Sequence, residues 1–462
     1  MFKKLVITGC LTLLILGGLL TGNAVAAEST AAPPPDTGDT AFMLISSALV
    51  LLMTPGLAFF YGGFVRSRNI LNTLMMSFVL MAIVGVTWVL WGYSLSFAPG
   101  LPFIGGLQWL GLNGVGLETT GYLQGSAPAE VVSYAPTIPH QAFMIYQAMF
   151  AIITPALISG AIAERMSFRA YCLFVVLWST FIYTPLAHMV WAKGGFLGLY
   201  GGIGALDFAG GTVVHISSAV SALVAAIVLG PRKNYPDRLS PPHNVPFILL
   251  GAGLLWFGWF GFNAGSALSA GTVATVAFVA TNTSAAAGSL MWLILEATLR
   301  GKPTAVGAVT GAVSGLVGIT PGAGFVTPLA AILIGLITSF LCFYAVSFKH
   351  KLRVDDALDT YPVHGVGGTI GAILTAFFAT TEVNSGGKDG VLRGNLNELF
   401  VELAAIAIAY IIAGVGTWII LKIIAATVGL RVPDQTENQG LDIHEHGEEG
   451  YNSEFADRIS NK

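Results

Sequence analysis

Apolar and polar residues alternate along this chain in long blocks, and the apolar blocks are its dominant feature. Eleven stretches of roughly 20 or more mainly apolar residues follow one another along the sequence. They lie near residues 41–65, 70–97, 140–163, 167–192, 208–230, 245–266, 271–297, 303–321, 326–347, 362–380 and 397–428. About 20 such residues form a helix that crosses the hydrocarbon core of a bilayer. The pattern therefore predicts an all-α integral membrane protein with eleven transmembrane helices.

The composition agrees with a chain that lies mostly in lipid. Hydrophobic residues make up 54% of the sequence and charged residues only 10%, whereas a soluble domain carries about 25% charged residues. A net charge of -3 without a basic run gives no reason to expect a nucleic-acid partner. The three cysteines lie in apolar stretches, so neither a disulfide framework nor a metal site is expected.

The first residues have the pattern of a secretory signal peptide. Lys3 and Lys4 precede an apolar run over residues 11–20, and Ala24-Val25-Ala26 has the small residues of a cleavage site. The alternative is an uncleaved first helix, but the run is shorter than the roughly 20 residues that span a bilayer. We therefore predict a signal peptide over residues 1–26.

Positive charges predict the orientation of the spans, because short cytoplasmic loops carry an excess of lysine and arginine. One set of alternate loops holds twelve of them: Arg66, Arg68, Arg165, Arg169, Arg232, Lys233, Arg238, Arg300, Lys302, Lys349, Lys351 and Arg353. The other set holds three, Lys193, Lys388 and Arg393. The mature N-terminus is thus expected outside, followed by a membrane domain over residues 27–430 and a cytoplasmic tail over 431–462.

Two histidines stand in otherwise apolar stretches, His215 in the fifth and His364 in the tenth, each a few residues after an aspartate. Ionisable side chains in membrane segments usually face the bundle interior or a transport path. Five spans plus five would form an inverted repeat with one last helix added, and equivalent residues of such repeats face each other at the bilayer midplane. The two imidazoles are therefore expected to meet, although a lone membrane histidine can equally serve as an interhelical hydrogen bond.

Paired imidazoles would have a specific chemistry. Two neighbouring neutral rings can share one proton between ring nitrogens, which fixes opposite tautomers. A charge on one ring disfavours a charge on the other. Such a pair suits the relay of one proton, or contact with a small hydrogen-bond donor, in an apolar bore.

Aromatic residues recur at helical spacing near these spans. Tyr146 and Phe150 lie one turn apart, while Trp259, Phe262 and Ser266 fall on one helix face. An aromatic stripe is more often part of a core than of a binding site. Longer strings carry more information, and six of them are MTPGLAFFYGGFVRSRN, GAIAERMSF, PLAHMVW, LDFAGGTVVHIS, WFGFNAGS and DTYPVHGVGG.

On these strings the chain resembles the ammonium transporter family, the Amt, Mep and Rh proteins, and within it the bacterial Amt branch. The resemblance covers nearly all of the mature chain. It implies ammonium uptake through a central pore in each subunit of a homotrimer in the bacterial inner membrane, without a cofactor. It also implies a cytoplasmic face that docks a regulatory protein of the PII type in many relatives.

The resemblance also assigns roles to residues. Trp191, Phe150 and Ser266 match an outer ammonium-recruitment site, to which Tyr146 is added although some relatives have phenylalanine there. Phe150 and Phe262 match a pair of stacked gate rings, and His215 and His364 match the pore histidines. Asp207, Trp259 and Asp359 are expected to support the site structurally. For Asp207, a helix N-cap is an equally compatible assignment.

The mechanism implied by the family is that ammonium loses its proton near the gate and ammonia passes the histidines. One alternative is an electroneutral channel of the Rh type for NH3 or CO2. A second is an ammonium sensor, for which the tail of about 30 residues is short. An enzyme is disfavoured, because no nucleophile elbow, P-loop or metal-ligand helix is present in the sequence.

Overall fold

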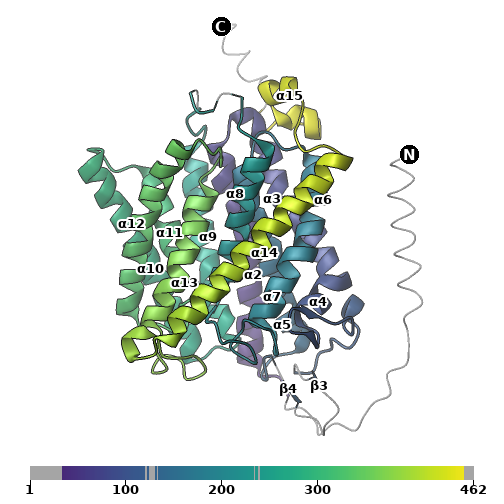
Figure 1. The fold of residues 1–462 in the computed structure, drawn as a ribbon, viewed down its shortest axis with the longest axis vertical. Helices are drawn as coiled ribbons and strands as arrows, with labels where there is room; N and C mark the ends of the chain where they lie inside the picture. Colours follow the sequence, from purple (N-terminus) through teal and green to yellow (C-terminus); the bar gives the residue numbers. More distant parts are fainter. Residues whose placement is uncertain are drawn as a thin grey trace.

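In the computed structural model, every one of the eleven apolar stretches is helical, and the helices form one bundle (Figure 1). The structure describes residues 34–119, 122–123, 131–132, 134–233, 235–237 and 240–451. The predicted signal peptide lies outside the described residues. The spans of the first half are α2 (Thr37–Phe64), α3 (Ile70–Thr87) with η2 (Trp88–Gly92) and α4 (Tyr93–Phe97), α5 (His140–Ile162), α6 (Phe168–Trp178) with η4 (Ser179–Tyr183) and α7 (Thr184–Trp191), and η5 (Gly211–Ile216) with α8 (Ser217–Leu229).

The second half has five further spans, and one last helix follows it. The five are α9 (Val245–Ala264) with η6 (Gly265–Ala267), α10 (Thr272–Leu299), α11 (Ala305–Ile319), α12 (Pro328–Leu352), and η7 (Tyr361–Gly365) with α13 (Val366–Phe378). The last helix is α14 (Asn397–Thr427), and the tail contains α15 (Asp434–Gln439) and η9 (Asp442–His446). Short elements in the loops are η1 (Ser67–Asn69), η3 (Leu110–Leu112), η8 (Val391–Arg393) and two small hairpins, β1 (Gly100–Leu101) with β2 (Ile104–Gly105) and β3 (Tyr122–Leu123) with β4 (Val131–Val132).

Within the described ranges, nine helices are long and apolar enough to cross a membrane. The two remaining spans, α11 and the η7–α13 helix, are shorter. After α11 the chain continues through residues 320–326 without helical structure, yet these residues are fully buried. Non-helical backbone at membrane depth is tolerated where protein covers it. The eleven-span prediction therefore agrees with the structure, and the short span α11 is continued by buried coil.

The two halves of the chain cross at their fifth spans. Helix α13 packs against the π-helical turn η5, and reciprocally α8 packs against the π-helical turn η7. This exchange of contacts is what an inverted repeat produces when its fifth and tenth spans meet. The approach is close because Gly368 of α13 has no side chain where it faces His215. The crossing point is thus the place where the predicted histidines come together.

The bundle has two ends, which we name from what they carry. The pocket face carries β3 and β4, and the tail face, at the opposite end of the bundle, carries α15 followed by η9 (Figure 1). On the tail face, Asp442 accepts hydrogen bonds from the backbone N–H groups of Leu71 and Asn72 at the start of α3, at 3.1 and 2.9 Å. Glu445 accepts one from the N–H of Phe168 at the start of α6, at 2.8 Å. The described part of the tail is therefore docked, and it caps two membrane helices.

An ion-pair cluster joins the loops of the tail face. Glu164 lies 2.8 Å from Arg66 and 2.9 Å from Arg232, and Arg232 also lies 2.8 Å from Asp355. Burial opposes ionisation of the Glu164 carboxyl, but the two guanidinium groups outweigh burial and lower its pKa to about 2. Arg66 and Arg232, which belong to the loops predicted to be cytoplasmic, therefore also hold the loops of the tail face together.

Candidate functional site

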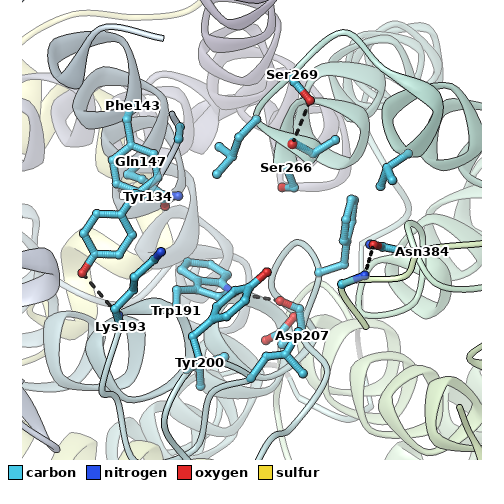
Figure 2. A pocket seen from close by; sticks show the side chains of 18 of the residues that line it. Tyr134, Phe143, Gln147, Trp191, Lys193, Tyr200, Asp207, Ser266, Ser269 and Asn384 are labelled. Carbon is cyan, nitrogen blue, oxygen red and sulfur yellow. Dashed lines mark hydrogen bonds between the residues drawn. The ribbon is translucent and has the colours of Figure 1, made fainter. Parts of the chain in front are cut away.

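A pocket of about 640 Å³ opens on the pocket face, and its wall combines aromatic rings with a few polar groups (Figure 2). Trp191 from the end of α7 and Ser266 from η6 lie on opposite sides of it. Phe150 of α5 and Asp207 of the loop before η5 also line it. An apolar pocket with few polar groups is the usual form of a small-molecule site.

The inner end of the pocket is closed by two stacked phenyl rings. Phe150 and Phe262 have ring centroids 4.3 Å apart at an interplanar angle of 28°, and Trp191 meets Phe150 edge-on at 5.7 Å. Phe150 lines the pocket, whereas Phe262 lines the next cavity inward. The two rings, which we call the gate, therefore separate the pocket from the interior of the bundle.

Beyond the gate is a cavity of about 10 Å³, which is room for about one water-sized molecule. Aliphatic side chains make up most of its wall, together with His215, His364, Trp259 and Phe262. The Nδ1 atoms of His215 and His364 lie 3.2 Å apart, and the rings are stacked with centroids at 5.3 Å. The predicted meeting of the two imidazoles is therefore observed.

The contact between the two Nδ1 atoms determines which ring nitrogens of the pair can be protonated. A hydrogen bond between two Nδ1 atoms needs one ring protonated at Nδ1 and the other with a bare Nδ1 and its proton at Nε2. His215 Nε2 is buried and has no hydrogen-bond partner among the residues that the structure describes. His215 also stacks on Trp259 at 5.5 Å, and Trp259 is held by a 3.0 Å bond from its Nε1 to Thr320 Oγ1. The pair is held in place and keeps one buried ring nitrogen unoccupied.

Asp207 caps the turn that carries His215. Its carboxylate accepts four successive backbone N–H groups, those of residues 210–213, at distances from 2.6 to 3.1 Å, and also the hydroxyl of Thr212. The backbone carbonyl of Asp207 accepts the indole N–H of Trp191 at 2.9 Å. One residue thus connects the pocket wall to the histidine turn, and its carboxylate is occupied by protein donors.

The corresponding cap in the second half is Asp356, a residue that sequence reasoning missed. Asp356 accepts the backbone N–H groups of Thr360 and Tyr361 at 3.1 and 2.7 Å, at the start of η7. It precedes His364 by eight residues, as Asp207 precedes His215 by eight. Asp359 instead has a positive φ of 57° and pairs with Lys349. The equal spacing was the sequence signal for the correct residue.

Tyr146 needs a correction, because it is not among the residues that line the pocket. The side chain is fully buried, and its hydroxyl lies 2.9 and 2.8 Å from the carbonyl oxygens of Gly261 and Phe262. It also lies 3.3 Å from Ser266 Oγ. A hydroxyl donates one hydrogen, so it is engaged by the end of α9. Tyr146 supports Phe262 and Ser266 from behind.

Sequence reasoning missed several residues that line the pocket. Gln147 of α5 is buried, and its Oε1 has no hydrogen-bond partner within the described part of the chain. Lys193, Tyr200 and Asn384 complete the rim (Figure 2). An amide next to Tyr146 in a membrane helix was a possible signal for Gln147. The three rim residues lie in loops, where hydrophobic patterning gives no information.

The fold and the site together define a multi-span membrane protein with a narrow, gated pore for a small solute. Comparison with known proteins agrees. A model of the ammonium transporter family matches residues 41–451. An ammonium transporter of Bacillus subtilis is 52% identical over 415 residues, covering 90% of this chain and 98% of the relative. An ammonium transporter of Mycobacterium tuberculosis strain H37Rv is 46% identical over 437 residues, or 91% and 92% of the two chains.

Solved structures show the same likeness. The crystal structure of Saccharomyces cerevisiae Mep2 superposes with a TM-score of 0.78 at 36% sequence identity, covering 86% of this chain and 88% of that one. The chain therefore belongs to the ammonium transporter family. The family consists of membrane transporters rather than enzymes.

Proposed function

We propose that this chain takes up ammonium, that the ion loses its proton at the gate, and that ammonia passes the histidine pair. The released proton crosses separately from the ammonia, so that the net uptake is of NH4+ and carries charge. The observation that carries this proposal is the 3.2 Å contact between two imidazoles in a cavity for one water-sized molecule, directly behind a closed aromatic gate. Ammonia has the size of water, and ammonium differs from an alkali ion by having protons to give up. A cavity for one water-sized molecule behind a closed gate admits ammonia but excludes an alkali ion, which has no proton to give up.

Recruitment would use Trp191, Phe150 and Ser266. Aromatic faces attract a cation by roughly 0.5 to 2 kcal/mol each, which is too little to strip a fully hydrated ion, so capture is weak and reversible. The Ser266 hydroxyl donates to the carbonyl of Phe262 at 2.9 Å. Its lone pairs therefore remain available to accept an N–H from ammonium.

Selectivity would come from the dry, apolar bore. An ion enters such a bore only after losing its water, and an unpaired charge in a low-dielectric interior is strongly disfavoured. Ammonium avoids that cost by leaving a proton behind, whereas sodium and potassium cannot. Ammonia then needs only hydrogen-bonding groups on its route, and the unoccupied Nε2 of His215 offers one. The histidine pair would accept and release hydrogen bonds without becoming charged.

The surroundings of the pore are also part of the proposal. The pocket face lies outside and the tail face in the cytoplasm of a bacterial cell, because the tail face carries most of the loop arginines and lysines. Three copies form a homotrimer with one pore each. Residues 1–26 direct the chain to the membrane and are removed. The docked tail and its neighbouring loops form the surface for a PII-type regulator.

The test is a current measurement on purified protein in liposomes on a solid-supported membrane. The unmodified protein should give a saturable ammonium response and none with potassium. Replacing both pore histidines by alanine should abolish selective ammonium flux, whereas His444→Ala, in the exposed part of the tail, should not. Unchanged flux with full discrimination against potassium in the double variant would refute the role of the pair. Ammonia-driven swelling without current would instead indicate the electroneutral alternative.

A further inference from the structure

Helix α14 lies outside the two repeats, yet it carries two buried carboxyl groups. Figure 1 shows α14 crossing the bundle diagonally, and it packs against α8 and η5. Glu398 and Glu402 lie one turn apart near the end of α14 at the pocket face, and both are 0% exposed. Carboxyl groups inside membrane segments are costly and usually serve a purpose. The recruitment site, the gate and the histidine pair do not account for them.

Among the described residues, Glu402 makes one hydrogen bond, with the loop before η5, and its Oε2 has no partner. Its Oε1 accepts the backbone N–H of Leu206 at 2.5 Å. Leu206 is 1% exposed and lies in a segment without helical structure. Without Glu402 this N–H would be a buried donor with no acceptor, which is an unfavourable arrangement. The carboxyl therefore fixes the position of this backbone segment.

The fixed segment leads directly to the two parts of the pore. Leu206 precedes Asp207, whose carbonyl holds the indole of Trp191 and whose carboxylate caps the turn of His215. A second anchor acts on the same segment, because Lys388 Nζ donates to the carbonyl of Gly204 at 3.0 Å. Any shift of residues 204–207 would thus move the pocket wall and the start of the histidine turn together.

We propose that Glu402 is a positioning residue for transport: it holds Leu206 and, through Asp207, sets the placement of Trp191 and of the turn that carries His215. This inference rests on the proposed function of the pocket and the pore. The positioning role requires a hydrogen-bond acceptor on α14 whose side chain is long enough to reach the N–H of Leu206. It does not require a charge, because the partner is a neutral N–H group.

Glu398 provides the matched control. It lies on the same helix, is equally buried, and neither of its oxygens has a hydrogen-bond partner in the described residues. Its nearest charged neighbour is Lys388, whose Nζ lies 3.9 Å from Glu398 Oε2. Removing this carboxyl changes burial and charge as at Glu402, but it leaves both hydrogen bonds to the loop in place, from Leu206 N–H to Glu402 and from Lys388 Nζ to the carbonyl of Gly204.

The experiment compares Glu402→Leu, Glu402→Gln, Glu402→Asp and Glu398→Leu in liposomes, with ammonium as substrate. Glu402→Leu should raise the apparent KM about tenfold, since the buried N–H loses its acceptor. Glu402→Gln keeps an oxygen at the same reach and should restore KM to within about twofold. Glu398→Leu should leave KM within the same range. If the leucine variant does not fold, Glu402→Asp, which is one methylene too short, replaces it and should raise KM.

Backbone hydrogen exchange separates this inference from the proposed function. Glu402→Leu, or Glu402→Asp in its place, should speed exchange in residues 204–213 relative to Glu398→Leu, whatever solute the pore carries. Absence of an ammonium current in the unmodified protein would overturn the proposed function and not the anchoring. Equal exchange and equal KM in the Glu402 and Glu398 variants would overturn the positioning role.

Discussion

Trp191 and His215 are connected through a single residue, because Asp207 accepts the indole N–H of Trp191 with its backbone carbonyl and caps the turn of His215 with its carboxylate. The pocket wall and the pore interior therefore cannot move independently. A substrate that shifts the indole acts on the same residue that orients the histidine turn.

Replacing Trp191 by leucine should weaken ammonium capture. The loss of one cation–π contact corresponds to about a 2- to 30-fold rise in apparent KM, with a smaller change in the maximal current. Trp418→Leu is the control, because Trp418 is 51% exposed on α14, away from the pocket lining. Saturation curves of ammonium current measure both variants. An equal KM for the Trp191 variant and the Trp418 control contradicts recruitment by Trp191.

Opening the gate should reduce the selectivity for ammonium over potassium more than it reduces the ammonium flux. Phe262→Ala removes the ring that stacks on Phe150 at 4.3 Å and joins the pocket to the cavity behind it. Water then enters, and a hydrated potassium ion no longer has to shed its whole shell, so discrimination should fall by more than roughly tenfold. The ratio of ammonium to potassium currents measures this. If Phe262→Ala is as selective as the unmodified protein, the gate is not the barrier that excludes potassium.

The cap of the second repeat should prove to be Asp356. Asp356→Ala leaves two N–H groups of η7 without their acceptor and should lower the free energy of unfolding by about 1 to 2 kcal/mol. Asp359→Ala removes an ion pair whose aspartate is 35% exposed and should cost less than Asp356→Ala, because Lys349 keeps its hydrogen bond to the carbonyl of Asp356. Unfolding of the detergent-solubilised variants compares the two. A larger loss for Asp359→Ala would contradict the assignment of the cap to Asp356.

The ion-pair cluster of the tail face predicts a pH dependence of stability. Glu164 has its pKa lowered from 4.5 to about 2 in the folded protein, because Arg232 and Arg66 outweigh its burial. Its contribution is therefore complete above about pH 4.5 and is lost as the pH falls from there towards 2. Glu164→Gln should be less stable at neutral pH and show a smaller further loss in acid. Asp434→Asn, in an exposed pair with Lys233, should behave as the unmodified protein does.

Much of the fold could be predicted from the sequence, because lipid imposes a length and a polarity on every span. The eleven stretches and the meeting of His215 with His364 follow from that constraint and from the 5+5 order. Hydrogen-bond partners that depend on tertiary distance could not be predicted in this way. The hydroxyl of Tyr146 is engaged by α9, more than 100 residues away, and Leu206 finds its acceptor 196 residues later in Glu402.

Asp356 was missed as the cap of the second repeat for a different reason. Asp356 and Asp359 both lie shortly before the second histidine, and hydropathy cannot separate them. The choice depends on which carboxylate reaches the first free N–H groups of the turn, and that depends on the spacing from the turn. Comparing the two halves residue by residue, with His215 aligned on His364, selects Asp356 at once.

The glycine at the crossing of the two halves has a further consequence. A methyl group at Gly368 would lie 2.9 Å from Cβ of His215, closer than real side chains approach. The neighbouring helix would have to retreat or the imidazole would have to tilt, and either adjustment changes the 3.2 Å separation between the two Nδ1 atoms. The geometry of the histidine pair is thus sensitive to a single added methyl group on the neighbouring helix.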